Sequence, residues 1–123
     1  MLNDDFDWTW NSGSTSTANS GPTADHTFST ATGHYMYIET SAPRRQGDKA
    51  RLISKTYPPI NNRCLTFWYH MYGLNIGQLN VYAGTPTSLG TAIWNLYGNQ
   101  GNRWLKAQVT VQTSTAFQVQ SAT

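Results

Sequence analysis

The chain offers few side chains that could carry out catalysis. Its three histidines, His26, His34 and His70, are far apart in the sequence and belong to different segments. Nucleophilic catalysis needs a nucleophile beside a base, and zinc hydrolysis needs closely spaced metal ligands with an acid. The sequence has no nucleophile elbow, no paired Cys ligands and no His-Glu-x-x-His run. We therefore expect a protein that is not an enzyme, with histidines in ordinary strand and loop positions.

Three aspartates, Asp7, Asp25 and Asp48, are the residues that could hold a metal. Carboxylates in loops, together with backbone carbonyls, bind hard cations such as Ca²⁺. The alternative for Asp25 is structural, because a short acidic side chain readily caps a loop by accepting hydrogen bonds from nearby backbone amides. No cofactor is required by either interpretation, and the sequence leaves both open.

Aromatic side chains are abundant, with five Trp and seven Tyr. Exposed rings could form a stacking platform for a sugar, but aromatics at strand spacing more often fill a core or cover a sheet. Arg44 and Arg45 in a predicted turn could contact an acidic partner, although such a pair is usually only solvated. Trp68, Tyr72, Arg44 and Arg45 are the candidate interaction surface.

A strand must position these residues, and the clearest one is the stretch from Cys64 to Gly73. Leu65, Phe67, Tyr69 and Met71 alternate there with Cys64, Thr66, Trp68, His70 and Tyr72. This period of two predicts a central β-strand with one face in the core. Its other face is also aromatic, so we expect another segment to cover part of it.

The remaining apolar alternations predict an all-β domain of about eight strands in two antiparallel sheets. Further strands are predicted near residues 5–10, 34–40, 49–56, 78–83, 91–97, 104–112 and 115–120. Residues 11–32 are rich in Ser, Thr and Gly and have almost no aliphatic side chain, so they predict one long loop. At 123 residues the chain has room for a single domain, residues 1–123.

Composition narrows the class of protein. Only 11% of the residues are charged, against roughly 25% in an average globular protein, and the formal net charge is +2. That charge is too small to predict nucleic-acid binding. No apolar run reaches the length of a membrane span and no secretion signal opens the chain, so a secreted protein would have lost it or belong to a larger precursor. The polar, aromatic composition is typical of an extracellular sandwich.

Cys64 is the single cysteine and has no partner for a disulfide within the chain. Free cysteines are commonly buried thiols. We expect a buried thiol, with a bridge to something outside the chain as the alternative.

These residues together resemble the MAM domain, the adhesion module named for meprin, the A5 antigen (neuropilin) and the receptor protein tyrosine phosphatase mu. The resemblance spans nearly the whole chain. Its signature corresponds here to Gly33, Tyr35, Met36, Thr40, Leu52, Cys64, Leu65, Phe67, Tyr69 and Gly73, with Tyr57 in place of one aliphatic residue. Segments such as Asp5-Phe6-Asp7-Trp8-Thr9, Gly21 to Thr27, Gln46 to Leu52 and Gly98 to Trp104 also occur in family order.

The resemblance implies a jelly-roll β-sandwich outside the cell, either secreted or part of an ectodomain. It also implies a cation near Asp25-His26-Thr27 in some members. Family members usually begin with a Cys-x-Phe-Glu strand and carry a later cysteine that would pair with the equivalent of Cys64, and both are missing here. Either the chain is a fragment of a larger protein, or a neighbour supplies an edge strand. In the second case residues 5–10 or 115–120 would pair with another chain.

The sequence therefore predicts a non-enzymatic extracellular adhesion or protein-recognition module, part of a larger or self-assembling protein. Its expected partners are proteins or copies of itself, with no nucleic acid and no membrane insertion. A carbohydrate-binding module that uses exposed aromatics is one alternative, and a structural subunit of an extracellular fibre or matrix is another.

Overall fold

The computed structural model describes residues 5–39, 45, 47–85, 88 and 90–122. Within these residues the chain forms eight β-strands and no helix. The strands are β1 (Thr9–Ser12), β2 (His34–Tyr37), β3 (Arg51–Ile53), β4 (Ile60–Tyr69), β5 (Gln78–Gly84), β6 (Trp94–Tyr97), β7 (Leu105–Thr113) and β8 (Gln118–Ala122). Among the described residues, no helix is long and apolar enough to cross a membrane.

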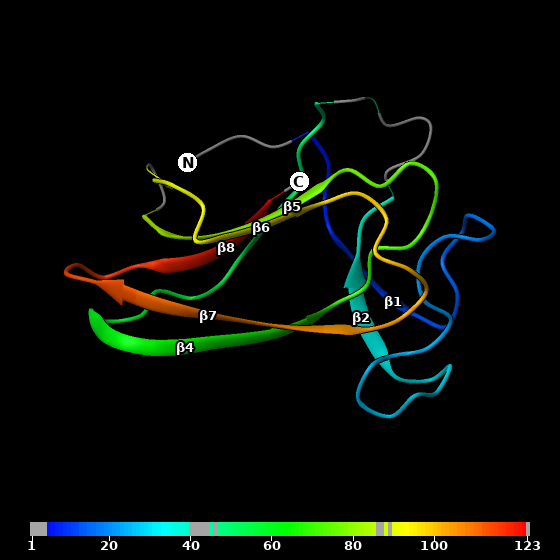
Figure 1. Cartoon of the computed structure of the whole chain (residues 1–123), viewed down its shortest axis with the longest axis horizontal. Helices are drawn as coiled ribbons and strands as arrows, with labels where there is room; N and C mark the ends of the chain where they lie inside the picture. The colour runs from blue at the N-terminus through cyan, green and yellow to red at the C-terminus, as the bar shows by residue number, and fades with distance from the viewer. Residues whose placement is uncertain (1–4, 40–44, 46, 86–87, 89, 123) are drawn as a thin grey trace.

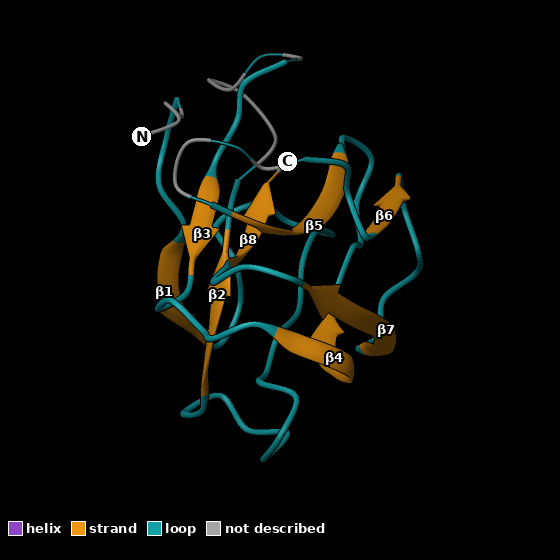
Figure 2. Ribbon diagram, turned by 90° about the vertical axis from the view of Figure 1, so that its left-hand side faces the viewer, coloured by secondary structure: helices purple, strands orange, loops and turns teal. Residues whose placement is uncertain are grey.

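The strands pair in three antiparallel groups, with the orders β1-β2, β3-β8-β5-β6 and β4-β7. Figure 2 shows β3, β8, β5 and β6 in one row, with β4 and β7 below them. In Figure 1 the β1-β2 pair crosses at one end of this sandwich. The all-β sandwich is confirmed. Among the described residues, the four-residue strands β1 and β2 pair with each other and form a third hydrogen-bonded group beside the two layers of the sandwich.

The core lies between the β4-β7 ribbon and the four-stranded sheet. Phe67 and Tyr69 of β4 pack around Trp94 of β6, with ring centroids 5.0 and 5.1 Å apart. From β7, Ala107 and Val111 are buried in the same space. The alternation of apolar and polar residues predicted these inward faces correctly, because successive side chains of a strand point to opposite sides.

β4 begins and ends earlier than the sequence indicates. It starts at Ile60, and an irregularity between Ile60 and Arg63 shifts its register against β7. It stops at Tyr69, because beyond this residue the backbone turns away to bond with the long loop. The carbonyl of Tyr72 accepts a hydrogen bond from the amide of Gly21 at 2.9 Å. The prediction that the strand continues to Gly73 is therefore wrong, and residues 70–73 lie against the long loop instead.

The two segments expected at an open edge have different positions. β8 lies inside the four-stranded sheet, between β3 and β5. The prediction that residues 115–120 form an edge is therefore wrong, because Ser54 and Tyr57 donate amide hydrogen bonds to the carbonyls of Val119 and Phe117. Of residues 5–10, Thr9 and Trp10 belong to β1, where they pair with Tyr37 and Met36 of β2. Pairing of that segment with another chain stays a prediction.

Candidate functional site

The long loop, residues 13–33 between β1 and β2, is fastened to the sandwich by contacts from distant residues. The indole Nε1 of Trp104 donates a hydrogen bond to the carbonyl of Ala24 at 3.0 Å. Four residues before Ala24 in the loop, the hydroxyl of Ser20 donates a hydrogen bond to the carbonyl of Tyr72 at 3.1 Å. A segment with almost no aliphatic side chains is thus held by hydrogen bonds, which buried backbone groups require in any case.

Asp25 closes the middle of this loop. Its two carboxylate oxygens accept the backbone amides of Phe28 and Thr30 at 2.8 and 3.0 Å. These amides hold the pKa of the Asp25 carboxyl below its usual value, since they stabilise the charged form. Gly33 packs against this carboxylate so closely that a Cβ on Gly33 would overlap it. Gly33 of the signature therefore leaves room for the Asp25 carboxylate that caps the loop.

Gly73, which follows β4, also leaves room for a side chain of the long loop. Its φ of +144° is one that residues with a side chain rarely adopt. A Cβ at this position would lie 2.7 Å from the Oγ and 3.1 Å from the Cβ of Ser20. The backbone at Gly73 thus approaches the loop at a distance that only glycine allows.

The fastened loop places His26 flat against Trp68. The two rings are stacked, with centroids 3.6 Å apart and planes inclined by 20°. Trp104 meets the edge of His26 at 6.3 Å, and His70 lies 5.4 Å from Trp104 and 6.3 Å from Tyr72. We call these five residues the aromatic cluster. Trp68 remains 46% exposed, so the cluster presents an aromatic surface to solvent.

His70 is held in a defined state within the cluster. Its Nε2 lies 3.2 Å from the side-chain oxygen of Asn102. Burial lowers the pKa of the His70 imidazole below its ordinary value, and the bond to Asn102 opposes this only in part. The ring is therefore neutral at physiological pH.

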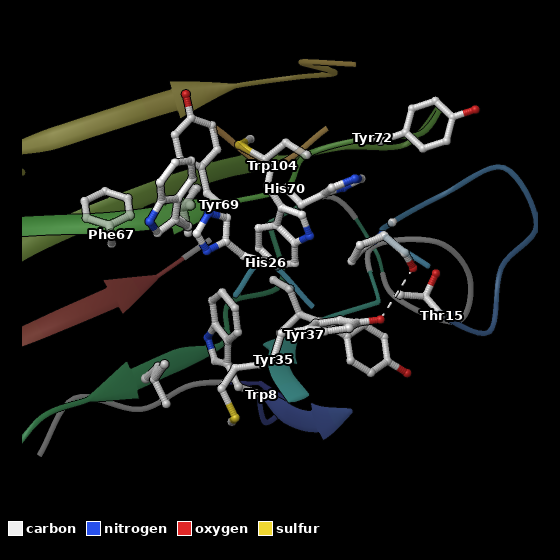
Figure 3. A pocket seen from close by; sticks show the side chains of 18 of the residues that line it. Trp8, Thr15, His26, Tyr35, Tyr37, Phe67, Tyr69, His70, Tyr72 and Trp104 are labelled. Carbon is white, nitrogen blue, oxygen red and sulfur yellow. Dashed lines mark hydrogen bonds between the residues drawn. The ribbon is translucent and has the colours of Figure 1, made fainter. Parts of the chain in front are cut away.

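A cleft of about 500 Å³ opens beside the aromatic cluster, between the two layers of the sandwich. Its floor includes Leu65 of β4 and Leu79 and Val81 of β5. Figure 3 shows Trp8, Tyr35 and Tyr37 on one side of this hollow and Phe67, Tyr69 and His70 on the other. The space expected to be a filled core is thus partly open, and Leu52, on its lining, is 39% exposed.

Tyr35 joins the cleft to the long loop. The side chain is buried, and its hydroxyl accepts a hydrogen bond from Asn11 and donates one to the carbonyl of Gly13. Burial raises the pKa of the Tyr35 phenol, so the hydroxyl keeps its proton and can donate. Met36, the next signature residue, is 38% exposed.

The three aspartates predicted to bind a cation do not come together. Asp7 is exposed, and one oxygen of Asp48 accepts the amide of Arg45 at 3.0 Å. Within the part of the chain that the structure describes, no three His, Cys, Asp or Glu side chains form a group that could hold a metal ion. The calcium hypothesis for Asp25 stays a prediction, and calorimetric titration with calcium would test it. Arg44 lies outside the described residues.

The expectation of a buried thiol at Cys64 is wrong, because the residue is exposed and free. Cys64, Thr66 and Trp68 share the outward face of β4. The long loop covers part of this face through His26 at Trp68, but Thr66 and Cys64 remain exposed. The sequence pattern places Cys64 on that face but does not indicate how far the covering segment extends.

Several residues of the site were not predicted. His26 and Trp104 lie far apart in the sequence, on either side of β4, and periodicity does not show that their rings meet. Asn102 looks like an ordinary turn residue. The one available signal was the outward aromatic parity of Trp68, His70 and Tyr72, which predicted a covered face but not its partners.

The comparison with known proteins agrees with this fold. The model of the MAM domain family, meprin/A5/mu, matches residues 1–122. The chain is 44% identical over 131 residues to mouse MAM domain-containing glycosylphosphatidylinositol anchor protein 2, covering 94% of this chain and 14% of the relative. It is 43% identical over 125 residues to human MAM domain-containing glycosylphosphatidylinositol anchor protein 1, covering 96% of this chain and 13% of the relative.

The chain thus spans only a small part of the relatives that it matches. Their names describe glycosylphosphatidylinositol-anchored proteins, and such an anchor holds a protein at the cell surface. This confirms the extracellular or ectodomain location predicted from composition. The family match over residues 1–122, together with the antiparallel sandwich, shows that the chain belongs to the MAM domain family.

Proposed function

We propose that this MAM domain is a non-enzymatic recognition module that binds a protein at the cell surface through the aromatic cluster. The observation that carries the proposal is the exposed Trp68 ring, which lies flat on His26. Trp and Tyr dominate the energetic centres of protein interfaces. A ring already fixed in place loses little conformational entropy on binding, which favours affinity.

The proposed experiment uses the purified chain, presented as a tetramer, on cells that display a panel of cell-surface ectodomains including the chain itself. Trp68→Ala should weaken binding about tenfold or more, as expected for a central aromatic residue. Trp10→Ala is the matched control, because Trp10 is 68% exposed and also stacks on a histidine, His34, outside the cluster. Equal loss in both variants, or none in Trp68→Ala, would contradict the proposal.

The two alternatives give different results in the same preparation. Carbohydrate binding predicts signals on a glycan array that Trp68→Ala abolishes. A fibre or matrix subunit predicts concentration-dependent mass in light scattering after size exclusion. Binding to a displayed ectodomain without either signal supports protein recognition.

A further inference from the structure

The charged residues are divided unevenly along the chain. All six Asp and Glu residues lie within residues 1–48. Residues 49–123 contain no carboxylate side chain, and their basic residues are Lys49, Arg51, Lys55, Arg63, Arg103 and Lys106. This part of the chain includes both strands of the β4-β7 ribbon and the turn before β7. One layer of the sandwich therefore carries positive charge and has no carboxylate of its own.

Lys106 lies beside Trp68 on the outward face of this ribbon. The two residues are directly paired across β7 and β4, and both are exposed. Side chains of directly opposite residues leave a sheet on the same face, with Cβ atoms about 5 Å apart. The next pair on this face, Thr66 with Gln108, is uncharged. The exposed indole of Trp68 thus has a cation as its cross-strand neighbour.

A second cation belongs to the turn before β7. Arg103 is exposed and lies in the sequence between two residues that contact the aromatic cluster. Asn102 accepts a hydrogen bond from His70, and Trp104 is a member of the cluster. Within the described part of the chain, neither Arg103 nor Lys106 is paired with a carboxylate. The positive charge beside the cluster is therefore available to a partner.

The carboxylates of the chain are largely engaged elsewhere. Asp25 precedes His26 of the cluster, but it is buried and both its oxygens accept backbone amides of the long loop. Three more described carboxylates also accept hydrogen bonds from other residues, namely Asp5, Glu39 and Asp48. Asp7 is exposed, in the segment before β1. A second copy of the chain would thus bring little free negative charge to Lys106, which favours a different protein as the source.

We propose that the partner segment bound by the aromatic cluster is acidic, with a carboxylate that binds Lys106 next to an apolar side chain that covers Trp68. The inference rests on the proposed function, since it names the charge of the protein that this surface binds. Opposite charge across an interface speeds association and excludes partners of the wrong charge. A polysulfated sugar fits less well, because it needs several basic residues close together, and the other basic residue of the ribbon, Arg63, is five positions from Trp68.

Distance separates the effects of the two cations on the ribbon. At about 3.4 Å per residue, Arg63 lies about 17 Å from Trp68 along β4. This exceeds the Debye length of about 8 Å at physiological ionic strength, whereas Lys106 lies directly opposite Trp68. Lys106→Glu should therefore weaken an acidic partner. Arg63→Glu is the matched control, because it changes the net charge by the same amount at another exposed position of the ribbon.

The test is an NMR titration of the whole chain with Ac-Asp-Tyr-Asp-NH₂ and its uncharged counterpart of equal shape, Ac-Asn-Tyr-Asn-NH₂. The acidic peptide should shift the indole N–H signal of Trp68 in a saturable way and bind about fivefold more tightly, as expected for a well-formed exposed ion pair. The indole signal of Trp10, which is exposed outside the cluster, is the internal reference. Equal affinity for the two peptides, or an unmoved Trp68 signal, would overturn the proposal.

Charge reversal on the protein gives the complementary test. Lys106→Glu should weaken the acidic peptide about fivefold or more and should gain affinity for Ac-Lys-Tyr-Lys-NH₂. Arg63→Glu should change either affinity by no more than about twofold at about 0.15 M salt. Both side chains are exposed, so both variants should fold, and their spectra without peptide would show this. Equal effects of the two variants would refute the assignment to Lys106.

Two further measurements address other occupants of the surface. If a heparin hexasaccharide shifts the Trp68 signal and the acidic peptide does not, the partner is a sulfated sugar and the proposal is wrong. Self-association in light scattering that Lys106→Glu abolishes would identify a second copy as the occupant and would also overturn it. Cell-surface binding that is lost in Trp68→Ala but unchanged in Lys106→Glu would overturn only this inference and leave the proposed function intact.

Discussion

Substituting Gly73 by alanine tests whether the long loop is held by close backbone approach. The φ of Gly73 is +144°, and an added Cβ would lie 2.7 Å from the hydroxyl oxygen of Ser20. Adopting such a backbone conformation costs a residue with a side chain roughly 1–3 kcal/mol. Displacing Ser20 also removes its hydrogen bond to the carbonyl of Tyr72, which is worth about 1 kcal/mol. We expect a loss of about 3 kcal/mol in the free energy of unfolding.

The matched control is Gly77→Ala, which makes the same chemical change in the same segment. Gly77 lies outside the left-handed region, and a Cβ there would meet no atom within 4 Å. This variant should be neutral or stabilise the protein by up to about 1 kcal/mol, because alanine restricts the unfolded chain. Both free energies would be measured by urea unfolding, followed by tryptophan fluorescence and compared at constant m value.

A double-variant cycle separates the two contributions at Gly73. Ser20→Gly should cost about 1 kcal/mol in the parent protein, because it removes the bond to Tyr72. The same change should cost almost nothing once Gly73→Ala has already displaced the serine. A Gly73→Ala variant within about 0.5 kcal/mol of the parent, or equal to Gly77→Ala, would refute the reasoning.

Three further predictions follow from the site. Gly33→Ala should lower the melting temperature by forcing out the Asp25 carboxylate, and it should have a much smaller effect in an Asp25→Ala background; additive losses would contradict this. Burial lowers the pKa of His70 in the folded protein below 6.5, so the unfolded chain takes up a proton at this residue first as the pH falls. The free energy of unfolding should therefore decrease between about pH 6.5 and the folded pKa of His70. The His70→Gln variant should lack this pH dependence. Cys64 is exposed and should react with Ellman's reagent as fast in the native protein as in urea, and slow native labelling would show a buried thiol.

The sequence alone determined the class of the fold and the inward faces of its longer strands. The alternation in β4 and β7 separates Phe67 and Ala107 from Trp68 and Lys106 with no knowledge of the fold, because side-chain direction in a strand follows from its period of two. The family signature was also readable. The sequence shows where the signature glycines are but not why glycine is needed there. The reason is tertiary, because a Cβ at Gly33 or Gly73 would overlap the side chain of Asp25 or Ser20 in the long loop.

The tertiary structure decided the rest, because each remaining feature depends on contacts between distant segments. The position of β8 inside the sheet, the stacking of His26 on Trp68 and the exposure of Cys64 have no local sequence signal. A loop of Ser, Thr and Gly has no apolar periodicity to show where it docks, so the hydrogen bonds that fasten it appear only when the chain is folded. The open cleft is likewise a property of how two layers meet, which neither layer encodes alone.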